Sequence, residues 1–156
     1  MPAPYVLLSG PSNPLDLGLL ETARAVGRLL AERGWYVLTG GLGGAMAAAA
    51  EGVDQAGGTA IAILPGTDRA DASPGHTIVL PTGLGEMRNA LLVRGADAVL
   101  AIGGSWGTLS EVALAASTGV PVVAVGSHLS GLPGPEVRFA ETPEAAVELL
   151  ATTLVP

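Results

Sequence analysis

The segment Ala98–Glu111 has the sequence AVLAIGGSWGTLSE: an apolar run, a glycine-rich turn and the approach to a helix. The run Ala98–Ile102 is continuously apolar, as expected of a strand that is covered on both faces. Val112–Ala116 continues as a helix-forming stretch. A glycine-rich turn between a strand and a helix leaves backbone N–H groups without partners, and the helix dipole adds partial positive charge there. The segment therefore predicts a parallel α/β sheet with an anion site at Gly103–Thr108.

Glu111 is the carboxylate nearest to this predicted anion site. We expect it in the first turn of the helix, close enough to contact whatever the phosphate is attached to. An acidic residue at that position is also favoured simply by the helix dipole. Trp106 is equally open to two interpretations, covering a flat part of the ligand or packing on a neighbouring subunit.

The rest of the chain alternates between strand and helix patterns. Strands are expected at Pro4–Ser9, Trp35–Thr39, Thr59–Leu64, Thr77–Leu80, Asp97–Ile102, Pro121–Val125 and Val137–Ala140. Helices are expected at Leu15–Arg33, Ala45–Gln55, Leu84–Arg94, after the glycine turn to about Ser117, and from Pro143 with Thr142 as its N-cap. This alternation predicts a doubly wound, mostly parallel Rossmann-like sheet with helices on both faces, forming a single domain over residues 1–156.

Ligands of such folds bind beyond the carboxyl ends of the strands, where the strand order reverses. Three segments that follow strands are therefore expected to meet there: Gly10–Asn13, Gly40–Gly44 and Gly103–Thr108. Taken alone, Gly40–Gly44 is either a tight connection or a ligand-binding turn. Its glycine spacing is not that of a dinucleotide-binding fingerprint, so the usual dinucleotide site is not expected.

The composition narrows the class of partner. Of the 156 residues, 49% are hydrophobic and only 13% are charged, which favours an oligomer, a homodimer or homotetramer, that covers part of a weakly charged surface. The net charge of −7 argues against nucleic-acid binding, which needs a basic face. The sequence has no apolar run of membrane-spanning length and no leader pattern, so we expect a cytoplasmic protein without membrane contact.

Several chemistries are excluded by residue types that the chain lacks. It has no cysteine, and all seven of its basic residues are arginine. Without lysine it forms neither a Schiff base to pyridoxal phosphate nor a Walker-type phosphate loop, so it is not a pyridoxal-dependent lysine decarboxylase. The only histidines, His76 and His128, fall in polar loops and are expected to be solvated. We therefore expect no metal site and no required cofactor.

The glycine-rich turns and the segment around Arg88 resemble motifs of the LONELY GUY family. Gly103–Glu111 is similar to the family's PGGxGTxxE motif, and Glu86–Asn89 resembles its arginine-bearing helix. Gly40–Met46 resembles its first glycine turn. The order and spacing match from Tyr5 to about Val125.

The resemblance implies an activity and a set of residues. The family's enzymes are phosphoribohydrolases, which cleave the N-glycosidic bond of nucleoside 5′-monophosphates. Arg88 and Glu111 would be the catalytic pair, and Gly104, Gly107 and Thr108 would hold the phosphate. A carboxylate is chemically suited to this reaction because the departing base leaves oxocarbenium character on the ribose.

Other motifs look closer to a sister branch, which includes the molybdenum cofactor carrier proteins. The shared features are Thr82–Gly85, Arg88 with Asn89, Ala101–Gly104 and Thr108–Glu111. Members of that branch bind a phosphorylated pterin and catalyse nothing. We therefore expect carrier-like binding of a nucleoside monophosphate or a molybdopterin-type cofactor. The alternatives are phosphoribohydrolysis and a sensor domain for a nucleotide signal.

The convergence of the turns and the family resemblance together predict the ligand-binding residues. They are Gly10, Ser12, Gly40, Gly41, Gly43, Gly44, Met46, Asn89, Gly103, Gly104, Ser105, Gly107 and Thr108.

Overall fold

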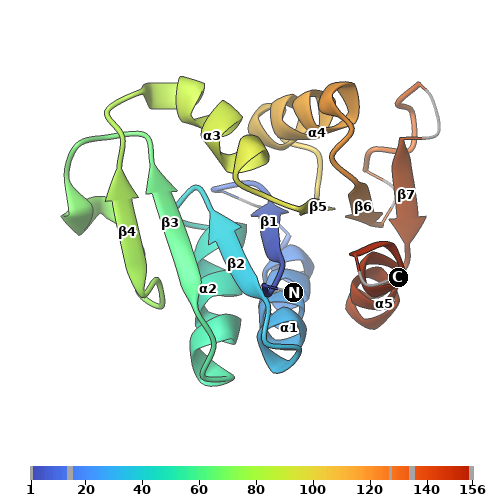
Figure 1. Cartoon of the computed structure of the whole chain (residues 1–156), viewed down its shortest axis with the longest axis horizontal. Coiled ribbons are helices and arrows are strands. Elements are labelled where there is room, and N and C mark those ends of the chain that lie inside the picture. Colours follow the sequence, from blue (N-terminus) through green and yellow to red (C-terminus); the bar gives the residue numbers. More distant parts are fainter. Residues whose placement is uncertain (1, 14–15, 127, 134–135, 155–156) are drawn as a thin grey trace.

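The structure, a computed structural model, describes residues 2–13, 16–126, 128–133 and 136–154 (Figure 1). Its strands are β1 Tyr5–Ser9, β2 Tyr36–Thr39, β3 Ala60–Leu64, β4 Ile78–Pro81, β5 Ala98–Ile102, β6 Val122–Val125 and β7 Val137–Ala140. Its α-helices are α1 Leu17–Glu32, α2 Ala45–Gln55, α3 Arg88–Arg94, α4 Trp106–Thr118 and α5 Pro143–Leu154. Two short 3₁₀ turns, η1 Arg69–Asp71 and η2 Gly85–Met87, complete the set.

The strands form one parallel sheet in the order β4-β3-β2-β1-β5-β6-β7. The chain winds outward from β1 to β4 in one direction and from β5 to β7 in the other. The winding therefore reverses between β1 and β5, where Leu7 pairs with Val99. This is the predicted doubly wound parallel fold, which is confirmed, and the reversal marks the place where such folds bind ligands.

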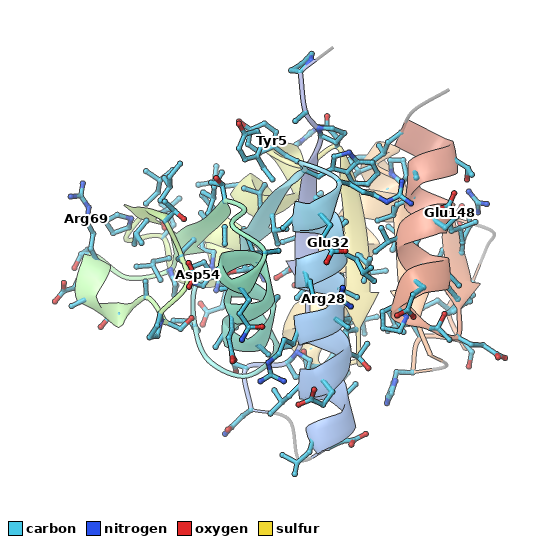
Figure 2. The ribbon with its side chains drawn as sticks, turned by 90° about the horizontal axis from the view of Figure 1, so that it is seen from below. Tyr5, Arg28, Glu32, Asp54, Arg69 and Glu148 are labelled. Atoms are coloured by element: carbon cyan, nitrogen blue, oxygen red, sulfur yellow. The ribbon has the colours of Figure 1, made fainter. Side chains whose placement is uncertain are left out.

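Helices cover both faces of the sheet. The helices α1, α2 and α5 pack on one face, and α3 and α4 pack on the other (Figure 1). Because side chains of a strand alternate between faces, Val6 and Leu8 join the core under the first layer and Leu7 joins the core under the second. Figure 2 looks onto the first layer, where Arg28 and Glu32 form an ion pair on the outer surface of α1. With both faces covered, the carboxyl edge of the sheet remains for a ligand.

The predicted helix Leu84–Arg94 is not continuous. It consists of the 3₁₀ turn η2 followed by α3, because Gly85 has a φ of +60°, a left-handed conformation that a right-handed α-helix does not contain. As a result Arg88 is the first residue of α3 rather than a residue in the middle of a helix.

The helix ends are set by local capping groups. The Asp16 side chain caps α1 by accepting from Gly18 N at 2.8 Å, and the predicted start at Leu15 lies outside the described residues. Thr142 caps α5 as predicted, with its hydroxyl accepting from Ala145 N at 3.1 Å. In the ranges that the structure describes, we find no helix that combines the length and the apolar character needed to cross a membrane.

Candidate functional site

A cleft of about 330 Å³ lies at the reversal point of the sheet, beyond the carboxyl ends of β1 and β5. Nine of the sequence-predicted site residues line it: Gly10, Ser12, Met46, Arg88, Asn89, Ser105, Gly107, Thr108 and Glu111. Pro11, Asn13, Leu42 and Glu86 complete the lining. The fold thus brings together four separate segments of the sequence, within residues 10–13, 42–46, 86–89 and 105–111.

The start of α4 forms one wall of the cleft. Ser105 caps this helix: its Oγ accepts from Thr108 N at 3.2 Å and lies 2.9 Å from Thr108 Oγ1. The helix therefore begins at Trp106, well before the helix-forming stretch that starts at Val112. Consequently Glu111 lies in the second turn of α4 and not in the first, which corrects the sequence prediction. The first N–H groups of the helix, those of Trp106 and Gly107, have no partner within the helix.

Arg88 forms the opposite wall and is 8% exposed. Its Nε donates to Ile63 O at 3.0 Å, its Nη2 to Gly40 O at 3.4 Å and its Nη1 to Asn89 Oδ1. A guanidinium has five N–H donors, so two remain for a ligand. Burial lowers the pKa of Arg88, while the charges of Glu111 and Glu86 raise it. The group stays cationic at any physiological pH.

Asn89 connects the two walls. Its Oδ1 accepts from Arg88, and its Nδ2 donates to Ser110 Oγ on α4 at 3.1 Å. The Ser110 hydroxyl in turn donates to Gly107 O at 2.7 Å. The hydrogen-bonding groups of Asn89 are thus partly used within the protein, and sequence reasoning missed Ser110 because nothing in its local pattern indicates a partner on α3.

Glu111 is the most unusual group in the cleft. Its side chain is buried, with the residue 8% exposed, and its Oε2 has no hydrogen-bond partner among the described residues. Burial raises the pKa of Glu111 to about 7, although the nearby Ser9 hydroxyl and the charge of Arg88 act to lower it. Ser9 Oγ, at the end of β1, is likewise buried without a partner of normal hydrogen-bonding geometry. A carboxyl in this state is ready to donate or accept a proton near neutral pH.

The predicted glycines outside the cleft lining lie against protein atoms. A Cβ on Gly40 would lie 2.6 Å from Arg88 Nη2, and one on Gly44 would lie 2.4 Å from Pro11 O. Gly41 faces Leu64 and Ala62 in the same way. The contacts of the other three are looser: Gly43 approaches Ser12, Gly103 approaches Pro11 and Gly104 approaches His128. A direct ligand contact from any of these six glycines stays a prediction.

His76 is half-buried and hydrogen-bonded within the protein, in contrast to the solvated side chain expected from its polar loop. Its Nδ1 lies 2.9 Å from Ser73 O and its Nε2 lies 2.7 Å from Thr39 Oγ1. Thr39 Oγ1 also accepts from Gly41 N at 2.9 Å, so the ring ties the loop to the first glycine turn. Burial lowers the pKa of His76, while its bond to the Ser73 backbone raises it. The partner that holds the ring is 37 residues away in sequence, beyond the reach of a local pattern. The second histidine, His128, is exposed, as expected.

The chemistry of the lining suits an anion better than a metal. The described lining residues offer hydroxyls, backbone N–H groups, a guanidinium and the carboxyl groups of Glu86 and Glu111, and they include neither histidine nor cysteine. Across the described parts of the chain, no three His, Asp or Glu side chains are grouped so as to hold a metal ion.

The fold is shared with known proteins. The model of the SLOG cluster4 family matches residues 5–149. An uncharacterized protein of Archaeoglobus fulgidus is 37% identical over 142 residues, covering 85% of each chain.

Several solved structures have the same fold as this chain. A molybdenum cofactor binding protein of the phototrophic bacterium Rippkaea orientalis is 34% identical, covers 99% of both chains and superposes with a TM-score of 0.92. The molybdenum cofactor carrier protein of Chlamydomonas reinhardtii is 31% identical, covers 99% of this chain and 100% of its own, and has a TM-score of 0.90. DNA processing protein A of Helicobacter pylori is 17% identical, covers 96% of this chain and 81% of its own, and has a TM-score of 0.72, a likeness of fold alone. The relationship predicted from the motifs is confirmed: the chain belongs to the SLOG cluster4 family.

Proposed function

We propose that the protein binds a phosphorylated small molecule in this cleft and carries it without changing it, with the molybdenum cofactor as the specific candidate. The observation that carries the proposal is the pairing of the α4 start with Arg88 across one cleft at the reversal point of the sheet. The names of the solved relatives, a molybdenum cofactor binding protein and a carrier protein, supply the candidate ligand.

The lining residues fit the phosphate end of such a ligand. The N–H groups of Trp106 and Gly107 form the positive end of the α4 dipole, and the Ser105 and Thr108 hydroxyls lie beside them. The two remaining donors of Arg88 add charge-assisted hydrogen bonds from the other wall. Because the described lining has no thiolate or imidazole, the protein would hold this ligand by its phosphate and leave the metal to the ligand's own sulfur atoms.

The proposal is tested by identifying and titrating the ligand. Mass spectrometry of the purified protein should find a phosphorylated pterin, which is recovered unchanged after incubation. Binding of a phosphorylated pterin should weaken about tenfold or more in Arg88→Gln, the loss expected for charge-assisted hydrogen bonds. Arg28→Gln, on the outer surface of α1, is the matched control and should bind as the wild type does (Figure 2). Equal binding by both variants would overturn the proposed site.

One observation favours a second function, the phosphoribohydrolase. Arg88 and Glu111 share the cleft, and the raised pKa of Glu111 suits a group that exchanges a proton or stabilises a developing cation. In this case incubation with adenosine monophosphate should release adenine and ribose 5-phosphate. The release should fall about 100-fold or more in Glu111→Gln, as for loss of one electrostatic contact to a transition state. Release that depends on both residues would overturn the carrier proposal, and no release from any monophosphate would leave binding as the function.

We propose further that two or more copies of the chain associate through the α3 side of the molecule. Leu84, Met87 and Leu91 are 49%, 76% and 47% exposed, and Trp106 at the start of α4 is 86% exposed. Exposed apolar side chains gathered on one surface are typical of an interface. Light scattering should give at least twice the 15.4 kDa mass of the chain, and Met87→Asp should reduce it. A monomer mass for the wild type would contradict the proposal.

A further inference from the structure

The anion site and the buried carboxyl of Glu111 are next to each other on the same helix. Gly107 and Glu111 are four residues apart in α4, and residues at this spacing lie on the same helix face with Cβ atoms about 6 Å apart. Glu111 is 8% exposed, lines the cleft and keeps Oε2 without a partner among the described residues. An anion held at the α4 start would therefore lie close to an unsatisfied carboxyl oxygen.

Few other charges surround this carboxyl. Arg88 faces it from α3, and Glu86 lies beyond, in the turn before that helix. From β1 the neighbouring polar group is the uncharged Ser9 hydroxyl. Among the described lining residues, Glu86, Arg88 and Glu111 are the titratable ones. Arg88 is thus the one positive side chain of the cleft, and the carboxyl and an incoming anion both interact with it.

We propose that Glu111 takes up one proton from solvent when an anion binds at the start of α4, so that ligand binding tightens in acid and ligand release is favoured in alkali. This inference rests on the proposed phosphate site. It assigns to Glu111 a role in controlling the affinity of a carrier, separate from any part in catalysis.

Three effects of the bound anion act in this direction. Its negative charge repels an ionised carboxylate, and the repulsion is strong because the Glu111 side chain is buried. It shares the guanidinium of Arg88, which otherwise favours the ionised form of Glu111. The protonated carboxyl has an O–H that can donate to an anion oxygen, which would give the unpartnered end of the side chain a partner. Because the pKa of Glu111 in the free protein is already about 7, the change falls in the physiological range.

Sulfate is a suitable probe because its own charge stays constant from mildly acidic to mildly alkaline pH. Any pH dependence of its binding therefore comes from the protein. The dissociation constant of sulfate would be measured by NMR, from the backbone amide shifts of Trp106 and Gly107, over a series of pH values. In the wild type we expect a constant value in acid and a weakening that approaches tenfold per pH unit above about pH 7. In Glu111→Gln the value should be the same at every pH and close to that of the wild type in acid.

Glu86→Gln is the matched control, because it removes the other carboxylate of the cleft, and it should keep the pH dependence. Calorimetry of the wild type in two buffers with different heats of ionisation gives the proton count directly, with up to one proton per sulfate expected above pH 7. This second measurement decides the matter even if Glu111→Gln fails to fold.

The possible failures are distinct. Sulfate that binds the α4 amides equally well at all pH values, without proton uptake, overturns the proton linkage and leaves the proposed site standing. A pH dependence that survives Glu111→Gln assigns the proton to another group and also overturns it. Sulfate that shifts no amide at the α4 start at any pH overturns the proposed anion site and the linkage with it.

Discussion

The two glycine-rich turns at the carboxyl edge of the sheet look alike in sequence but differ in what surrounds them. In the first turn, Gly40–Gly44, the spaces beside Gly40, Gly41 and Gly44 are filled by side chains and backbone of other segments. In the second turn and the helix start that follows it, Gly107 has no neighbour within 4 Å where a Cβ would be, and Trp106 is 86% exposed. A glycine is needed in the first turn because the protein packs tightly there. In the second, the space beside Gly107 is open, and we propose that a ligand occupies it.

Arg88 makes the two turns dependent on each other. Its guanidinium donates to Gly40 O in the first turn and, through Asn89 and Ser110, is connected to Gly107 in the second. The first turn is also joined to the loop after β1, since Ala45 N donates to Pro11 O at 2.9 Å. We interpret the packed turn as the support that fixes the position of the arginine, and the open turn as the place where the ligand binds.

The largest loss of stability is expected when a side chain is added to a glycine of the first turn. Gly44 has a φ of +62° and a ψ of −130°, and a Cβ there would lie 2.4 Å from Pro11 O, which is backbone. Gly44→Ala should lower the free energy of unfolding by about 3 kcal/mol or more, because backbone strain and overpacking add. Urea denaturation measures it.

Gly34→Ala is the control for that experiment. Gly34 also has a positive φ, +75°, but no atom lies within 4 Å of its Cβ position. Gly34→Ala should lower the free energy of unfolding by about 1–2 kcal/mol, through backbone strain alone. Equal losses in the two variants would show that the first turn is not tightly packed.

Substitution of Glu111, which lines the cleft beside the second turn, should instead raise the free energy of unfolding. The pKa of Glu111 is about 7 in the folded protein, against an ordinary value of 4.5, so the folded state holds a proton that the unfolded state releases between these pH values. The unfolding free energy should therefore fall as pH rises from 4.5 to 7. Glu111→Gln removes this loss, and above pH 7 the variant should be roughly 3 kcal/mol more stable than the wild type.

Comparing the two proteins across pH separates Glu111 from all other titrating groups. Their stabilities should converge below pH 4.5, where the carboxyl becomes protonated in both states, and diverge toward pH 7. A difference that is constant with pH would mean that Glu111 is ionised in the folded protein at little cost. The expected pattern is that of a binding site, where a group is kept at some expense of stability.

The contrast between the turns also explains what the sequence could and could not predict. Continuous apolar runs such as Ala98–Ile102 identified the strands, because burial on both faces leaves no other pattern. The resemblance of the motifs indicates Arg88, whereas the place of Glu111 next to the glycine-rich turn already indicates that residue. The packing of Gly41 against Leu64, the partner of His76 and the Asn89–Ser110 bond were not predicted, since each joins residues that the fold brings together from distant segments. The sequence pattern predicts the start of α4 too late because Trp106 and Gly107 are poor helix formers, whereas in the structure the Ser105 cap begins the helix at Trp106.

A smaller loss of stability is expected when the Ser105 cap of α4 is removed. Ser105 Oγ accepts from Thr108 N, whereas the first turn's Gly44 begins α2 without any side-chain cap. Ser105→Ala should lower the unfolding free energy by about 1 kcal/mol, the usual cost of losing an N-cap. Ser105→Thr keeps an acceptor oxygen and should stay close to the wild type. If Ser105→Ala were as stable as the wild type in thermal unfolding, the cap would not be holding the start of α4.

The smallest effect on stability, and the sharpest contrast with Gly44, is expected at Gly107. This residue is the second of α4, and a Cβ there meets no atom within 4 Å. Gly107→Ala should fold and be more stable by about 0.5 kcal/mol, since alanine forms helices better than glycine. The added methyl group nevertheless enters the cleft that Gly107 lines, so sulfate or a phosphorylated pterin should bind more weakly to this variant. Denaturation and an anion titration on the same sample measure both effects. A variant that binds anions as well as the wild type does would show that the open space beside Gly107 is not ligand space, and the distinction between a packed turn and a binding turn would no longer hold.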